Sequence, residues 1–250
     1  MFVRPTNPIS HRLARMAFIA ACTSALIVTA AGPLHRYLGV DIEAAIAIFR
    51  YGFYVAVAGI ALGLATIVPT RPGDRRRGFV AALLAIVIGA AGAWVPVSWF
   101  LHAQQLPVIN DISTDTANPP ALVATLPLRR GAANPPAYPG AAAAALQRAA
   151  YPDIVTVVLP VPPAEAFKRV DRVATALDWD VVARAPAEGR LEAVETSEWF
   201  GFRDDIVVRI RVNGAGSRID IRSKSRVGES DLGVNARRIR DFIARLKAER

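Results

Sequence analysis

The sequence predicts an α+β protein in which three apolar N-terminal transmembrane helices precede a two-layer domain of helices on an antiparallel sheet. Three observations lead to this class. Apolar residues make up 53% of the chain, and their excess lies almost entirely before residue 102. Proline and alanine are frequent in residues 103–150. From residue 151 onward, strand and amphipathic helix patterns follow in the order strand, helix, four strands, helix.

Three stretches without a charged side chain are long enough to cross a membrane as helices. They cover residues 16–34, 51–70 and 78–101. A helix needs about 20 apolar residues to span the hydrocarbon core of a bilayer. We therefore expect residues 1–102 to form a membrane anchor with three transmembrane helices.

Arginines predict the orientation of these spans. Two flanking segments are rich in arginine: Arg4, Arg12 and Arg15 before the first span, and Arg71, Arg75, Arg76 and Arg77 between the second and third. Because basic flanks stay in the cytoplasm, we expect a bacterial inner-membrane protein with a cytoplasmic N-terminus and a periplasmic C-terminal domain. The small residues Ala30-Ala31-Gly32 also suggest a cleaved signal peptide in place of the first span, which leaves this placement unchanged.

Residues 103–150 are expected to form an extended strap that leaves the membrane and wraps the following domain. The tetrapeptide Asn-Pro-Pro-Ala occurs twice, at residues 118–121 and 134–137. Paired prolines favour extended backbone, and they cannot donate hydrogen bonds to a sheet or helix.

A soluble α+β domain is expected at residues 151–250. The predicted strands cover residues 154–159, 179–185, 191–197, 206–212 and 218–225. Helices are predicted to begin at Pro162-Pro163 and near Ser230-Asp231, and Asn213-Gly214 should make a hairpin of the last two strands. Alternation along the final strand turns its isoleucines inward and its charged side chains outward: Arg218, Asp220, Arg222 and Lys224.

Three sequence blocks occur in order in the second half of the chain. They are Pro-Val-Ile-Asn-Asp-Ile-Ser-Thr-Asp at 107–115 with Asn-Pro-Pro at 118–120, Trp-Phe-Gly-Phe-Arg-Asp-Asp at 199–205, and Ser-Arg-Ile-Asp at 217–220 continuing to Ser-Asp-Leu-Gly-Val-Asn at 230–235. Together they resemble the bacterial membrane-anchored family catalogued as domain of unknown function 1499, over about residues 105–247. This resemblance implies no particular activity. The order of elements is also similar to the helix-grip lobes of the envelope lipoprotein BamC.

Histidine and cysteine are confined to the first 102 residues: His11, His35, His102 and Cys22. The soluble domain therefore lacks the parts of Ser-His-Asp and Cys-His nucleophiles and of typical zinc sites. We predict no catalytic residue, no bound metal and no cofactor. The surplus of arginine flanks the predicted spans, which argues against nucleic acid as a partner.

One polar cluster keeps carboxylate chemistry open: Asp111, Ser113, Asp115, Asp204 and Asp205. Such carboxylates could ligate a hard cation or share a proton. The alternative is that residues 111–115, with Thr114 among them, fix a turn through bonds from side chains to backbone. Neighbouring residues of a strand face opposite ways, so Asp204 and Asp205 cannot both serve one site without a bulge.

A second candidate is an anion-binding site built from Arg222, Lys224, Arg226, Asn235 and Arg238. Three of these basic side chains share one strand face, and a helix start with its exposed N–H groups follows within a few residues. The alternative is a solvated strand face whose charges pair with nearby acids: Asp220, Glu229 or Asp231.

These observations favour a non-enzymatic, membrane-anchored module of the cell envelope that binds another envelope protein or an anionic lipid headgroup. A loop with Trp199, Phe200 and Phe202 is expected either in the core or as a contact patch for lipid or protein. An envelope enzyme that uses carboxylates with Mg²⁺ or Ca²⁺ is the alternative. A purely structural subunit of a larger membrane complex is a third interpretation.

Overall fold

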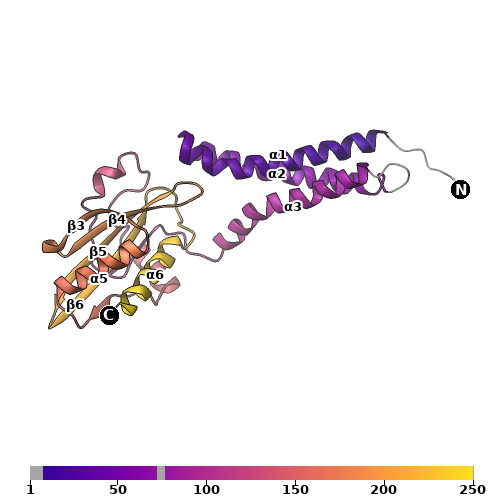
Figure 1. Cartoon of the computed structure of the whole chain (residues 1–250). Helices are drawn as coiled ribbons and strands as arrows, with labels where there is room; N and C mark the ends of the chain where they lie inside the picture. Colours follow the sequence, from indigo (N-terminus) through magenta and orange to yellow (C-terminus); the bar gives the residue numbers. More distant parts are fainter. Residues whose placement is uncertain (1–7, 72–76, 250) are drawn as a thin grey trace. The chain divides into compact units, whose positions relative to one another are not determined.

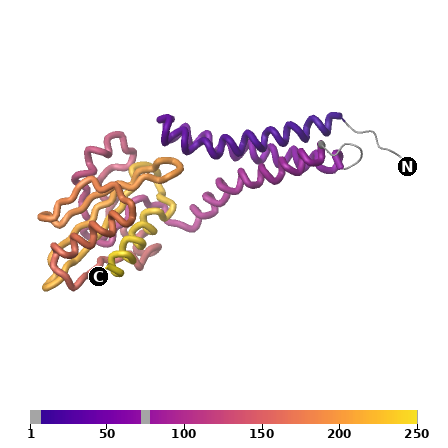
Figure 2. Tube along the Cα trace, viewed as in Figure 1, coloured from indigo at the N-terminus to yellow at the C-terminus, as the bar shows by residue number. Residues whose placement is uncertain are grey.

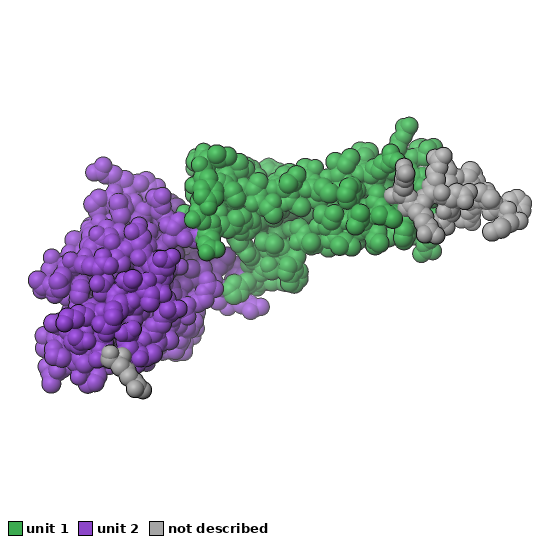
Figure 3. All heavy atoms as spheres, in the orientation of Figure 1, with its two compact units in different colours: residues 1–102, 198–201 green, residues 103–197, 202–250 purple. Residues whose placement is uncertain are grey.

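The computed structural model describes residues 8–71 and 77–249. Arg4, Arg75 and Arg76 of the arginine-rich flanks lie outside the described residues. The chain divides into two compact units, which are coloured separately in Figure 3. The first unit extends to His102 and includes Glu198–Gly201, and the second comprises Ala103–Ser197 and the residues from Phe202 onward.

Three long apolar helices build the first unit (Figure 1): α1 Pro8–Leu38, α2 Ile42–Ile67 and α3 Arg77–Ala103. Each is long and apolar enough to cross a membrane, as predicted. Helix α2 begins before the uncharged stretch because Asp41 caps it, accepting hydrogen bonds from the N–H groups of Glu43 (2.8 Å) and Ala44 (3.3 Å). Small residues allow close helix packing, and the Ser24 hydroxyl donates to the Gly52 carbonyl over 2.8 Å.

An antiparallel sheet organises the second unit, in the strand order β1-β6-β5-β4-β3 with β2 also paired to β6. The strands are β1 Asp111–Ser113, β2 Val157–Leu159, β3 Asp180–Ala185, β4 Arg190–Thr196, β5 Arg203–Asn213 and β6 Gly216–Ser225. The helices are α4 Ala141–Ala150, α5 Pro163–Ala176 and α6 Val234–Ala248, with short 3₁₀ turns at Leu126–Arg129 and Pro186–Glu188. This confirms the predicted fold class. Strand β1 and helix α4 lie within the segment that was expected to be extended strap throughout.

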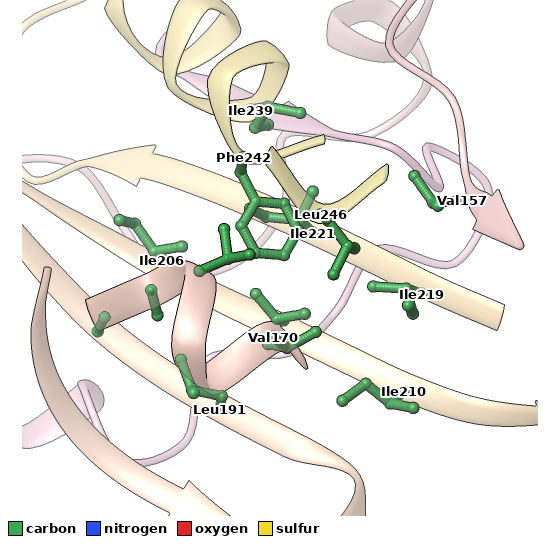
Figure 4. Packing of buried hydrophobic residues seen from close by; sticks show 14 of the residues in the cluster. Val157, Val170, Leu191, Ile206, Ile210, Ile219, Ile221, Ile239, Phe242 and Leu246 are labelled. Carbon is green, nitrogen blue, oxygen red and sulfur yellow. The ribbon is translucent and has the colours of Figure 1, made fainter. Parts of the chain in front are cut away.

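Helices α5 and α6 lie side by side on one face of the sheet (Figures 1 and 2). Figure 4 shows the apolar core that they close, in which Val170 and Phe242 meet isoleucines of β5 and β6. The Trp179 ring stacks on Phe242 with 5.5 Å between ring centroids. Burial of this apolar core supplies the main favourable free energy of folding of the domain.

The last helix begins later than predicted. Leu232 and Gly233 both have positive φ, +52° and +76°, so the backbone is not helical until Val234. Asp231 nevertheless stabilises the start, because its carboxylate accepts hydrogen bonds from the N–H groups of Gly233 and Asn235, each over 2.9 Å.

The opposite face of the sheet, which we call the strap face, is contacted by strap residues 118–136, whose backbone groups bond to side chains of β4, β5 and β6 and to Arg226. The charged side chains of β6 that were expected to face solvent are instead buried there: Asp220, Arg222 and Lys224, with Arg226 just beyond the strand. The outward direction was predicted correctly. The prediction of solvent exposure was wrong for these residues and right for Arg218, whose side chain is 38% exposed. A local strand pattern shows which face a residue is on, but not whether a distant segment covers that face.

Candidate functional site: the charged strap face

The buried end of the strap face holds Asp111 between two cations of β6. Arg222 grips the carboxylate through two hydrogen bonds of 2.8 Å, and the Lys224 ammonium donates to it over 2.7 Å. The register of β1 against β6 sets Asp111 directly opposite Lys224. Burial lowers the pKa of Lys224, while the charge of Asp111 and its hydrogen bond act in the opposite direction. Only 1% of the Lys224 side chain is exposed, so solvent does not screen this pairing.

Asp205 on β5 is a second buried carboxylate of the strap face, and it also pairs with two cations. Arg226 donates to it through Nη2 over 2.6 Å and through Nε, and Arg129 from the strap contacts its other oxygen. Arg226 also donates to the Leu128 carbonyl over 2.8 Å. Each of the two aspartates thus contacts two cations, and the Asp205–Arg129 pair ties the strap to the sheet.

Glu192 on β4 holds the strap at a third point. Its carboxylate is fully buried and accepts the backbone N–H groups of three consecutive strap residues: Val123, Ala124 and Thr125. Burial acts to raise the pKa of Glu192, but these hydrogen bonds outweigh it, and the pKa is lowered from its usual value. Glu192 therefore stays ionised and acts as an anchor.

The other end of the strap face is open. Asp115 from the strap and Asp220 from β6 lie among three arginines: Arg209, Arg211 and Arg218. Burial acts to raise the pKa of Asp220, but hydrogen bonds from Thr156, Arg218 and Arg209 outweigh it and lower the pKa overall. The side chains of Arg211 and Arg218 are 39% and 38% exposed, against 4% for Arg222. Both ends of the strap face thus pair aspartates with basic side chains, but solvent reaches those side chains only at the open end.

The five residues of the predicted anion site do not come together. Arg222, Lys224 and Arg226 are on the strap face, whereas Asn235 and Arg238 belong to α6 on the other face. Arg238 pairs there with Asp204 over 2.8 Å and with Glu195 over 2.6 Å, and Asn235 bonds to the hydroxyls of Ser223 and Ser225. The local alternative also named the wrong partners, because the three strap-face cations pair with Asp111 and Asp205.

The predicted polar cluster is divided in the same way. Asp204 and Asp205 face opposite sides of the sheet, as strand alternation requires. Asp111 lies in β1, and the Ser113 hydroxyl bonds to the backbone of Asp115 in the turn that follows. Among the residues that the structure describes, no group of three His, Cys, Asp or Glu side chains is placed to hold a metal ion.

The aromatic loop belongs mainly to the first unit. The rings of Trp199 and Phe200 lie 5.6 and 6.0 Å from that of Phe49, and Phe200 is 2% exposed. Phe202 belongs to the second unit and is half-buried.

Several strap-face residues were not singled out from the sequence, notably Arg129, Asn134, Gln147 and Glu192. Gln147 on α4 clamps β1, donating to the Ser113 carbonyl over 2.7 Å and accepting its N–H over 2.9 Å. Asn134 begins the second Asn-Pro-Pro-Ala copy, and that repeat was the one signal that pointed to it.

Fold and site together define a class: an α+β domain with a strapped, charged sheet face that follows three helices of membrane-spanning length. A family model described as a protein of unknown function (DUF1499) matches residues 111–246, more than half of the chain. The chain belongs to this family, as the three sequence blocks predicted. A search of curated proteins finds no match to it.

Proposed function

We propose that this chain is a non-catalytic, membrane-anchored module of the bacterial cell envelope that binds an envelope protein or an anionic headgroup through its second unit. One observation carries the proposal. The carboxylates that sequence reasoning offered for chemistry are engaged by basic side chains of the same chain: Asp111, Asp115, Asp204 and Asp205. Carboxylates that are ion-paired within the chain contribute to the fold, and they are not free to act on a substrate or to ligate a metal ion.

The placement of the second unit outside the cytoplasm is part of this proposal. It is supported by arginines before the first uncharged stretch, at residues 4–15, and between the second and third, at residues 71–77. An absence of cysteine after residue 102 also makes the second unit compatible with an oxidising compartment.

Metal titration of the full chain in detergent tests this proposal against the carboxylate enzyme that is its alternative. We expect the same thermal unfolding midpoint in EDTA, Mg²⁺ and Ca²⁺ at matched ionic strength, because arginine or lysine already occupies the carboxylate oxygens. A saturable rise in the midpoint with either cation that is lost in Asp204→Asn or Asp205→Asn would favour the enzyme.

A further inference from the structure

We propose that Arg209, Arg211 and Arg218 form an oxyanion-binding site that takes a phosphate group, at the end of the strap face that the strap leaves open. The shared ligand chemistry is a phosphate, carried either by a lipid headgroup or by a free phosphate compound. This deepens the proposed function, and it rests on that function only for the choice of a headgroup as one source.

The register of the sheet gathers the three guanidinium groups. Arg209 and Arg211 are two residues apart on β5 and therefore share a face, and Arg218 on β6 is directly opposite Arg211. Like charges placed opposite each other across a ladder repel, so this arrangement needs anions beside it. Asp220, opposite Arg209, and Asp115 from the strap supply two.

The charges at this end do not balance. Three guanidinium groups meet two carboxylates. Asp115 accepts from Nη2 of all three arginines at 3.2, 3.3 and 2.8 Å through one oxygen, Oδ2. One carboxylate oxygen shared by three cations leaves a surplus of positive charge for a further anion.

The three arginines also have nitrogen atoms that make no hydrogen bond within the chain. Arg209 and Arg211 reach the carboxylates through Nη2 alone, and Arg218 uses Nε and Nη2. Across residues 8–71 and 77–249, Nη1 of these three side chains makes no hydrogen bond. The Nε atoms of Arg209 and Arg211 also have no partner, but they are buried and a ligand cannot reach them. A guanidinium group whose Nη1 is unbonded still has charged donors to offer the oxygens of a phosphate group.

Access distinguishes this end from the buried end. At Arg222 the strap carbonyls of Pro120 and Pro136 fill the remaining donor positions, so an incoming anion would have to displace the strap. At Arg211 and Arg218 more than a third of each side chain is exposed, and a ligand can approach without unfolding. The Asp115 carboxylate belongs to the same chain, and it competes with an incoming anion for the guanidinium groups of the three arginines.

The test uses the full chain in a non-ionic detergent, titrated with inorganic phosphate against chloride at equal ionic strength and followed by calorimetry. We expect saturable phosphate binding that weakens as salt rises, because charges in a partly exposed site are screened over about 8–10 Å. A second arm places the full chain in phosphatidylcholine nanodiscs and adds vesicles of phosphatidylcholine with or without phosphatidylglycerol. Binding of the anionic vesicles alone would identify a headgroup as the source, and binding of inorganic phosphate alone would identify a free phosphate compound.

Three variants assign the binding to these residues. Arg211→Gln should weaken phosphate binding about tenfold, as expected for one lost charge-assisted contact. Asp115→Asn keeps the side-chain shape and removes the competitor, so it should tighten binding by about fivefold, a direction that misfolding cannot produce. Arg240→Gln removes the same charge from an exposed arginine of α6, which pairs with Asp153, and should leave binding unchanged.

Failure of the site is separable from failure of the proposed function. Binding of neither phosphate nor anionic vesicles would overturn the site, and so would equal affinities for wild type, Arg211→Gln and Asp115→Asn. Neither result bears on the metal titration, which tests whether the chain is an enzyme.

Discussion

At the scale of single residues, Asp111 determines whether two buried cations can be tolerated. Arg222 and Lys224 are almost fully enclosed, and Asp111 is the carboxylate that both of them contact. Removing one partner of a buried ion pair leaves a charge that neither water nor protein compensates, and that is more costly than the pair itself was favourable.

We predict that Asp111→Asn lowers the free energy of unfolding of the second unit by about 3–5 kcal/mol. Native-state hydrogen exchange at the β6 amides of the full chain measures this quantity. Asp153→Asn is the matched control, because its pair with Arg240 is about half exposed and should contribute about 0–1 kcal/mol. Equal losses in the two variants would show that burial of Asp111 does not determine its contribution.

A second residue-scale prediction concerns pH and Glu192. The folded-state pKa of Glu192 lies below its usual value of 4.5, so the stabilisation is complete above pH 4.5 and is lost as pH falls through the folded pKa. Glu192→Gln should be less stable than wild type at pH 7, and this difference should shrink below pH 4.5. The comparison cancels other groups such as Asp231, whose pKa is raised by burial. A difference that stays constant from pH 7 to pH 3 would contradict it.

At the scale of elements, the two Asn-Pro-Pro-Ala copies have a common structural role. The third residue of each copy, Pro120 and Pro136, offers its carbonyl to the Arg222 guanidinium, over 3.1 and 2.9 Å. The two copies differ at their asparagines. Asn134 donates through its side chain to the carbonyls of Ser225 and Gly228, over 3.1 and 2.9 Å. Asn118 instead bonds through its backbone, to Asp115 and Arg209.

This difference gives a matched pair of substitutions. Asn134→Ala should lose two hydrogen bonds and about 1–2 kcal/mol of strap stability, seen as faster hydrogen exchange and proteolysis around residues 130–140. Asn118→Ala leaves the backbone bonds in place and should change either rate by less than about twofold, or roughly 0.4 kcal/mol. Similar effects of the two changes would mean that the asparagine side chains do not hold the strap.

At the scale of the whole molecule, the distribution of arginine carries the predicted topology. Residues 78–106 have no charged side chain, and arginines are concentrated before the first uncharged stretch and between the second and third. Because translocating arginine across a bilayer is costly, those two segments should share the cytoplasmic side.

Reporter fusions test this orientation. Alkaline phosphatase, which is active outside the cytoplasm, should be active when fused after Arg250 and inactive when fused after Arg77. A fluorescent protein that matures in the cytoplasm should show the reverse pattern at the same two positions. An active phosphatase after Arg77 with an inactive one after Arg250 would invert the topology and with it the envelope placement of the second unit.

The sequence by itself determined the three apolar helices, the main strands and helices of the second unit, the hairpin at residues 213–214 and the family. Each of these depends on a pattern that is complete within a few neighbouring residues, such as a twenty-residue uncharged stretch or a period of two along β5 and β6. The same rule correctly separated Asp204 from Asp205.

Only the tertiary structure decided which charges are buried and which carboxylate each one meets. Asp111 and Arg222 are 111 residues apart, and Arg129 and Asp205 are 76 apart. A basic strand face has the same sequence whether water or a strap covers it, and β1 is too short to be recognised without its partner β6. The physical reason is that an ion pair depends on distance in space and on exclusion of water, neither of which a local pattern records.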